Sequence, residues 1–88
     1  MIEMGATRDY AVPNGLPRVK QRWLDERIDY LANGHRHVLT ITSVGKTVTG
    51  WQCRLVRHEV DADGNVVVEV GHGIMFVDHL FEWCKPLD

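Results

Sequence analysis

The sequence is poor in cysteine, in long apolar runs and in excess positive charge, and each shortage removes a class of protein. Two cysteines among 88 residues do not make a disulfide framework, so we expect Cys53 and Cys84 to be reduced thiols. The longest apolar run, residues 74–77, has four residues, whereas a membrane-spanning helix needs about 20. Glu3 stands where a signal peptide would carry Lys or Arg. These features predict a cytoplasmic protein that is neither exported nor inserted into a membrane.

The composition is typical of one folded domain, and its charge is divided along the chain. Hydrophobic residues make up 44% of the sequence and charged residues 25%, which is a globular composition. The net charge is −2, but residues 16–57 carry eight basic against three acidic side chains, and residues 58–88 carry one basic against seven acidic. This division either steers a charged partner to one end of the molecule or attracts the two halves to each other.

A helix is expected over residues 17–33, after an N-terminal arm of residues 1–16. Pro17 suits a first helical turn, and Asn33 with Gly34 supplies a left-handed exit. On a helical wheel the apolar residues cover an arc of about 180°, which is wider than a surface helix needs. Either the arm or a partner would cover the surplus. Opposite the arc lies a polar face that we expect in solvent: Arg18, Gln21, Arg22, Asp25, Glu26 and Asp29.

Alternating β-branched residues predict an antiparallel sheet after this helix. Gly45-Lys46 fits a two-residue hairpin turn, and Asp61 to Gly64 has the turn chemistry of a second hairpin. Beyond the sheet, Asp78 can cap a short helix over residues 79–84. We therefore predict a single α+β domain over residues 17–88, with an N-terminal amphipathic helix, a short C-terminal helix and four antiparallel strands: 36–44, 48–60, 65–72 and 74–77.

The second hairpin predicts which residues form the core. Pairing across its turn places Leu55 opposite Val70 and Cys53 opposite His72. One face then carries the residues that we expect to be buried: Trp51, Cys53, Leu55, Val66, Val68 and Val70. The first hairpin would put its apolar residues on the other face. Either a bulge at Gly50 corrects this, or the sheet curls strongly into a small barrel-like form with the helix over its second face.

No arrangement of reactive residues predicts catalysis, a cofactor or a metal site. Gly45-Lys46-Thr47 lacks the earlier glycine and the following helix of a phosphate-binding loop. Five histidines and two cysteines are the right residue types for zinc, but their spacings match no zinc motif. Cys53 opposite His72 would supply a nucleophile and a base without a third, orienting group. We therefore expect a protein that is not an enzyme and that holds neither a metal nor a cofactor.

Two binding functions are consistent with these features. The first is a small non-enzymatic accessory protein, of bacterial or phage type by its size, that binds another protein or a second copy of itself. Aromatic and arginine side chains are favoured at interfaces, so we expect the partner to contact one face of the helix: Lys20, Trp23, Arg27 and Tyr30. The alternative is a small nucleic-acid-binding module whose basic residues follow phosphates: Lys46, Arg54 and His58.

Overall fold

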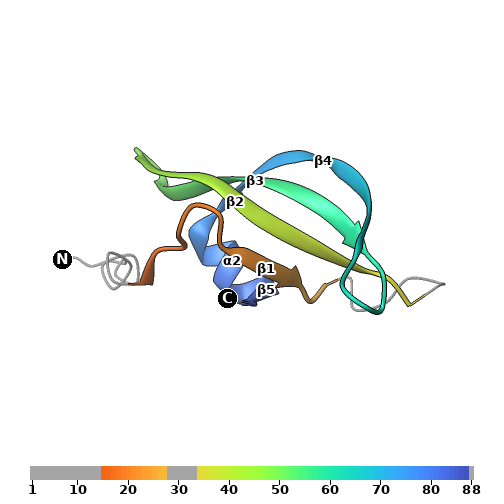
Figure 1. Ribbon diagram of the computed structural model, residues 1–88. Helices are drawn as coiled ribbons and strands as arrows, with labels where there is room; N and C mark the ends of the chain where they lie inside the picture. Colours follow the sequence, from red (N-terminus) through yellow and green to blue (C-terminus); the bar gives the residue numbers. More distant parts are fainter. Residues whose placement is uncertain (1–14, 28–33, 88) are drawn as a thin grey trace.

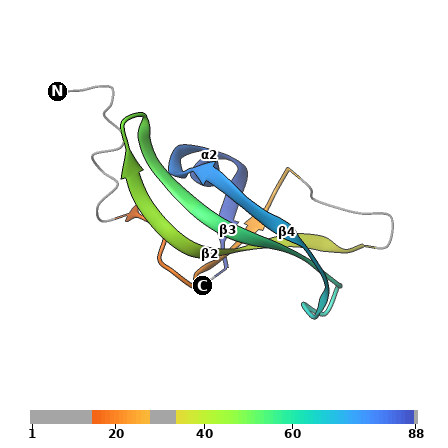
Figure 2. The same cartoon turned by 90° about the horizontal axis from the view of Figure 1, so that it is seen from above.

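The computed structural model describes residues 15–27 and 34–87, which form an antiparallel sheet with one short helix (Figures 1 and 2). The elements in chain order are β1 (Arg22–Asp25), β2 (Arg36–Thr47), β3 (Gly50–Val60), β4 (Val66–Phe76), α2 (Val77–Trp83) and β5 (Cys84–Pro86). The strand order in the sheet is β4-β3-β2-β1-β5, and all neighbours are antiparallel. Strands β2, β3 and β4 form a long twisted meander, and α2 lies beneath it beside β1 and β5 (Figure 1). We call the face of the sheet that carries α2 the inner face.

The helix predicted over residues 17–33 is wrong for the part of it that the structure describes. A strand, β1, stands in its place and pairs with β2 on one side and with β5 on the other. Just before β1, Lys20 has a φ of +74°, which is far from helical backbone. Helix propensity is a weak preference, and strand pairing on both sides of β1 overrides it. Residues 28–33, with Tyr30, and residues 1–14 lie outside the described part of the chain.

The second hairpin turns where the sequence predicts. The Asp61 carboxylate accepts backbone hydrogen bonds from Asp63 and Asn65, each 2.9 Å long. Gly64 takes a φ of +87°, a conformation that glycine adopts without a steric penalty. Its backbone N–H donates to the Asp61 carbonyl oxygen at 3.0 Å. The aspartate therefore organises the turn, and the antiparallel hairpin of β3 and β4 is confirmed.

The first hairpin turns later than predicted. Strands β2 and β3 continue to pair as far as Thr47 opposite Gly50, so Gly45-Lys46 is part of β2 and not the turn. The Thr47 hydroxyl donates to the Gly50 carbonyl oxygen at 2.9 Å and stabilises the turn. The irregularity that brings the apolar residues of both strands to one face lies between Ile41 and Ser43, not at Gly50.

The predicted register of β3 against β4 is wrong. Leu55 lies opposite Gly73 and not opposite Val70, because the pairing shifts at two irregularities near the start of β4. Leu55 is buried as predicted, but Val68 and Val70 keep 48% and 49% of their surface exposed. Their exposure follows from the position of β4 at the edge of the sheet, where it has a neighbouring strand on one side only.

The core lies between the inner face and α2. Its buried members are Trp23, Leu39, Ile41, Cys53, Leu55, Val77, Leu80 and Cys84. The sheet is open and not strongly curled (Figure 2), so the predicted barrel-like form with a helix over its second face is wrong. The short C-terminal helix is present at Val77–Trp83, and β5, which was not predicted, follows it. No helix among the described residues has the length and apolar character needed to cross a membrane.

Candidate functional site

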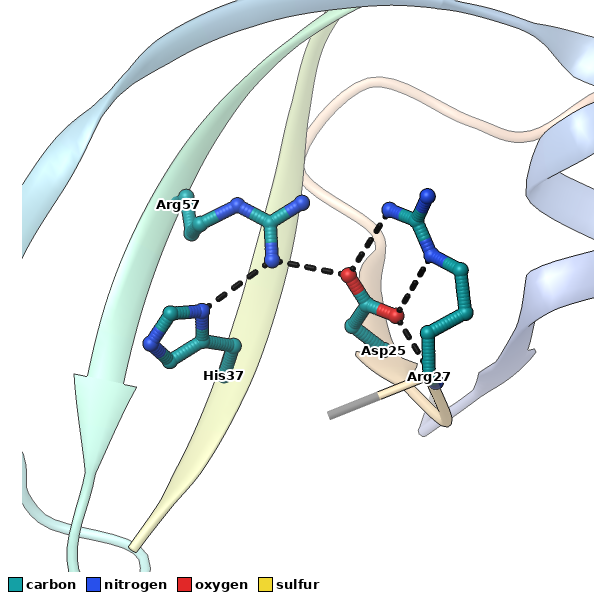
Figure 3. Close-up of polar contacts among 4 residues, drawn as sticks. All are labelled: Asp25, Arg27, His37 and Arg57. Atoms are coloured by element: carbon teal, nitrogen blue, oxygen red, sulfur yellow. Dashed lines mark hydrogen bonds and ion pairs between the residues drawn. The ribbon is translucent and has the colours of Figure 1, made fainter. Parts of the chain in front are cut away.

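Asp25, on the inner face of β1, is the one charged side chain of the described residues that is completely buried. Arg27 donates to its carboxylate from the backbone N–H at 3.0 Å, from Nε at 3.2 Å and from Nη2 at 3.1 Å. Arg57 of β3 donates through Nη1 to Oδ2 at 2.8 Å, and the same nitrogen lies 3.1 Å from Nδ1 of His37 on β2 (Figure 3). We call these four residues the Asp25 cluster.

The two arginines fix the charge of Asp25. Burial by itself would raise the pKa of the carboxyl group, but the hydrogen bonds from Arg27 and Arg57 outweigh burial and hold the pKa below its ordinary value. The contact with Asp25 also raises the pKa of Arg27. Asp25 is therefore ionised at neutral pH. Because both carboxylate oxygens already accept hydrogen bonds from arginine, Asp25 is poorly placed to act as a general base.

Arg27 also joins the Asp25 cluster to α2. Its guanidinium carbon lies 4.1 Å from the centre of the Trp83 ring, within the range of a cation–π contact. Trp83 stacks in turn on His79, with ring centres 4.3 Å apart. The backbone N–H of Glu26 donates to the Trp83 carbonyl oxygen at 2.8 Å. These contacts hold the chain that leaves β1 against the end of α2, so the cluster has a structural role.

The residues predicted to contact a partner do not share a helical face, because the described residues do not form that helix. Trp23 is 5% exposed, and its ring lies 5.7 Å from that of Phe81 within the molecule. Arg27 belongs to the Asp25 cluster. Lys20 is exposed in the turn before β1, and Tyr30 lies outside the described residues. The argument from a helical face is therefore wrong, and contact of Lys20 or Arg27 with a partner stays a prediction.

The structure brings together two of the three basic residues predicted to contact nucleic acid. Lys46 and Arg54 line the same surface hollow, of about 190 Å³, near the first hairpin turn. His58 lies further along β3, where its Nε2 is 3.7 Å from a carboxylate oxygen of Glu69. A phosphate-following surface would therefore rest on Lys46 and Arg54 alone.

Neither cysteine is placed to act as a nucleophile. Both are free and buried, and burial raises the pKa of each thiol to about 11. Cys53 lies opposite Met75 and donates from Sγ to its carbonyl oxygen at 3.4 Å, so the predicted pair of Cys53 and His72 is wrong. Within residues 15–27 and 34–87, no group of three or more His, Cys, Asp or Glu side chains is arranged to hold a metal ion.

Strand β4 has the most unusual surface of the described molecule. It contains eleven residues, forms one edge of the sheet and pairs with β3 alone. Five apolar side chains of β4 keep between 48% and 63% of their surface exposed: Val66, Val67, Val68, Val70 and Ile74. Glu69 and His72 are the only ionisable residues of β4, and the strand contains no proline. The opposite edge, β5, has only three residues and includes Pro86.

The sequence carried a signal for this surface that our core prediction did not use. Val66, Val68 and Val70 were assigned to one buried face. Three consecutive valines, 66–68, place apolar side chains on both faces of an extended strand. A sheet that buries one face cannot enclose all of them, so the run predicts either a strand buried on both faces or an apolar strand left uncovered.

No protein-family model, curated protein or solved structure matches this chain, so its own geometry is the basis for a functional assignment.

Proposed function

We propose that this chain is a non-enzymatic interaction protein whose binding surface is the β4 edge, and that the strand bound there is β4 of a second copy. The observation that carries the proposal is an eleven-residue edge strand with five exposed apolar side chains. Unpaired N–H and C=O groups along such an edge are a template for another strand. Apolar patches left exposed on a folded domain are typical of binding sites.

The contrast between the two edges supports β4 as the surface. Proteins that avoid edge pairing shorten the edge strand or place lysine or proline in it. Strand β5 has both a short length and a proline, Pro86. Strand β4 has neither device, since it is long and contains neither lysine nor proline. By length and by proline content, β5 is thus the better protected edge, whereas β4 has only the two irregularities in its pairing with β3.

The polar centre of β4 favours a second copy as the occupant. Glu69 lies 3.5 Å from His72 on its own strand and 3.7 Å from His58 on β3. Two copies of β4 that pair antiparallel are related by a two-fold axis, so each copy presents the same strand to the other. An axis near Val70 and Gly71 would bring Glu69 of one copy beside His72 of the other. The charge on this strand would then have a complementary partner across the interface.

The buried polar groups support a role without catalysis. Both thiols have a pKa of about 11, so neither forms an appreciable amount of thiolate at neutral pH. Asp25 is enclosed by arginine donors. Free thiols also fit the cytoplasmic location that we retain as part of this proposal.

Sedimentation velocity over a range of protein concentrations tests the proposal. We expect a monomer–dimer equilibrium that Val68→Lys weakens by at least about tenfold, because a charge would enter the apolar edge. Val48→Lys is the matched control, since Val48 is fully exposed in the first turn, outside β4, and it should leave the equilibrium unchanged. A wild-type chain that stays monomeric at all concentrations, or equal behaviour of the two lysine variants, contradicts self-pairing through β4.

Nucleic-acid binding is the second candidate, favoured by the shared hollow of Lys46 and Arg54. Single-stranded DNA would then bind more weakly as salt rises, and the double variant Lys46→Ala, Arg54→Ala would flatten that dependence. Fluorescence anisotropy with a labelled oligonucleotide measures both effects. Absence of binding at low salt would remove this candidate.

A further inference from the structure

The Asp25 cluster leaves part of one arginine available for a ligand. Nη1 of Arg57 contacts Asp25 at 2.8 Å and His37 at 3.1 Å, whereas its Nε and Nη2 have no hydrogen bond to any described residue. In Figure 3 both contacts of Arg57 leave from one terminal nitrogen, and its other two nitrogens make no contact with Asp25, Arg27 or His37. A guanidinium presents Nε and one terminal nitrogen as a planar fork that matches a carboxylate.

The charge balance of the cluster also favours an anion. One carboxylate, Asp25, is paired with two guanidiniums, those of Arg27 and Arg57. His37 accepts the contact from Arg57 through Nδ1, because an arginine can only donate, so the imidazole is neutral in this arrangement and adds no positive charge. The cluster therefore carries one surplus positive charge. The Arg57 side chain is only 20% exposed, so water screens that charge less than it would at the surface.

A hollow beside Arg57 provides the space. It measures about 220 Å³, and its lining includes Arg57, Leu55, Met75 and two glycines of β4. The glycines account for its presence, because Gly71 lies opposite Arg57 and Gly73 lies opposite Leu55. A larger residue at either position would project a side chain from the inner face of β4 over its partner on β3. With glycine at both positions, Leu55 and Arg57 border an open volume.

We propose that this hollow binds a small monocarboxylate with a short apolar chain. The carboxylate accepts two hydrogen bonds from Nε and Nη2 of Arg57, and the chain contacts Leu55 and Met75. At about 30 Å³ per water molecule, the volume corresponds to about seven waters, which suits a carboxylic acid of about four to six carbons. Inorganic phosphate could accept from the same nitrogens of Arg57 but has no apolar part to contact Leu55 and Met75, so we expect it to bind more weakly than the monocarboxylate. Val70, His72 and Ile74 of β4 also border this hollow, so the site lies beside the edge proposed for self-pairing, and ligand binding and self-association are measured separately.

Titration of the full chain with hexanoate, followed by NMR, tests the proposal. We expect saturable shifts of the Arg57 Nε–H and of the Gly71 and Gly73 amide resonances. Hexan-1-ol, which has the same chain without the charge, should bind at least about tenfold more weakly, because it cannot accept the paired hydrogen bonds of the guanidinium. No saturable shift with hexanoate, or equal binding of hexanoate and hexan-1-ol, would overturn the proposal. Binding of inorganic phosphate as tight as that of hexanoate would overturn the assignment to a monocarboxylate.

The substitution Gly73→Leu tests the location of the site without touching the Asp25 cluster. A Cβ atom at Gly73 would lie 3.7 Å from Leu55 Cδ1, an ordinary contact, and the backbone there is not in the left-handed region. The variant should fold, fill the hollow and weaken hexanoate binding by at least about tenfold. Val48→Leu, at a fully exposed position in the first turn outside both β4 and this hollow, is the matched control and should bind like the wild type. Unchanged binding by folded Gly73→Leu would place the ligand elsewhere and refute the site.

Discussion

The substitution Asp25→Asn tests whether the Asp25 cluster holds the chain after β1 against the sheet and α2. Four hydrogen bonds reach the carboxylate, three from Arg27 and one from Arg57. Asparagine keeps the shape of the side chain but loses the charge. Its amide nitrogen would also meet arginine donors at a position where a carboxylate oxygen now accepts them.

The expected loss of stability follows from the exposure of the two arginines. Removing one partner of a buried ion pair typically costs about 3–5 kcal/mol, because the remaining charge is left without compensation. The Arg27 side chain is 43% exposed and can turn toward water, whereas Arg57 is much less able to do so. We therefore expect a somewhat smaller effect, a decrease of about 2–4 kcal/mol in the free energy of unfolding at pH 7.

Urea unfolding followed by tryptophan fluorescence measures this decrease, since Trp23 is buried in the folded state. Glu26→Gln is the matched control. Glu26 is the adjacent acidic residue, its side chain is exposed, and its substitution should change stability by less than about 0.5 kcal/mol. An Asp25→Asn variant within about 1 kcal/mol of the wild type would refute the structural role of the cluster.

The pH dependence of the same difference checks the direction of the Asp25 pKa. The folded-state pKa is lowered, so ionised Asp25 stabilises the fold fully above the unfolded-state pKa of about 3.9 and loses this effect as the pH falls through the lower folded value. The stability difference between wild type and Asp25→Asn should thus be constant near neutrality and shrink in acid below about pH 4. A difference that grows as the pH falls would contradict the assigned direction.

Three further outcomes follow from the fold. Leu80→Ala should lower the free energy of unfolding by about 2–5 kcal/mol in urea titrations, because Leu80 is fully buried between α2 and the sheet; a loss below about 1 kcal/mol would argue against this packing. Cys53 and Cys84 should react with a thiol reagent at pH 8 far more slowly in the folded than in the unfolded protein, because both are buried and have a pKa of about 11. Equal rates in the two states would contradict their burial. Asp61→Ala should lower the melting temperature measured by circular dichroism, whereas Asp63→Ala should not, because only the Asp61 side chain accepts the two turn hydrogen bonds.

Local turn chemistry was readable from the sequence, and long-range pairing was not. The Asp61 to Gly64 turn depends on neighbouring residues, so its prediction was correct. The register of β3 against β4 depends on irregularities that no local pattern reveals, and Val70 was therefore placed opposite Leu55, where Gly73 lies. The irregularities in β4 shift its register, and its position at the edge of the sheet leaves the predicted core valines exposed.

The misassigned helix has a similar explanation. Trp23 and Leu24 lie on opposite sides of β1, which a helical wheel represents as one broad apolar arc. The apolar arc of about 180° is wider than a surface helix needs, and this width was the sign in the sequence that the spacing of the apolar residues was not helical. Asp25 was placed on a solvated helical face, because nothing in the local sequence indicates that Arg57 lies beside it. The cluster depends on residues 32 positions apart in the chain, and such contacts are set by the tertiary fold.

Amide hydrogen exchange along β4, measured at a series of protein concentrations, tests whether β4 pairs with β4 of a second copy. The β4 amides that do not face β3 should exchange rapidly in dilute protein and become protected as the concentration rises, because they then donate to β4 of a second copy. Val68→Lys should abolish this concentration dependence, and the β3 amides should change little. If these β4 amides exchange rapidly at every concentration, β4 does not pair with a second copy and the proposed function is wrong.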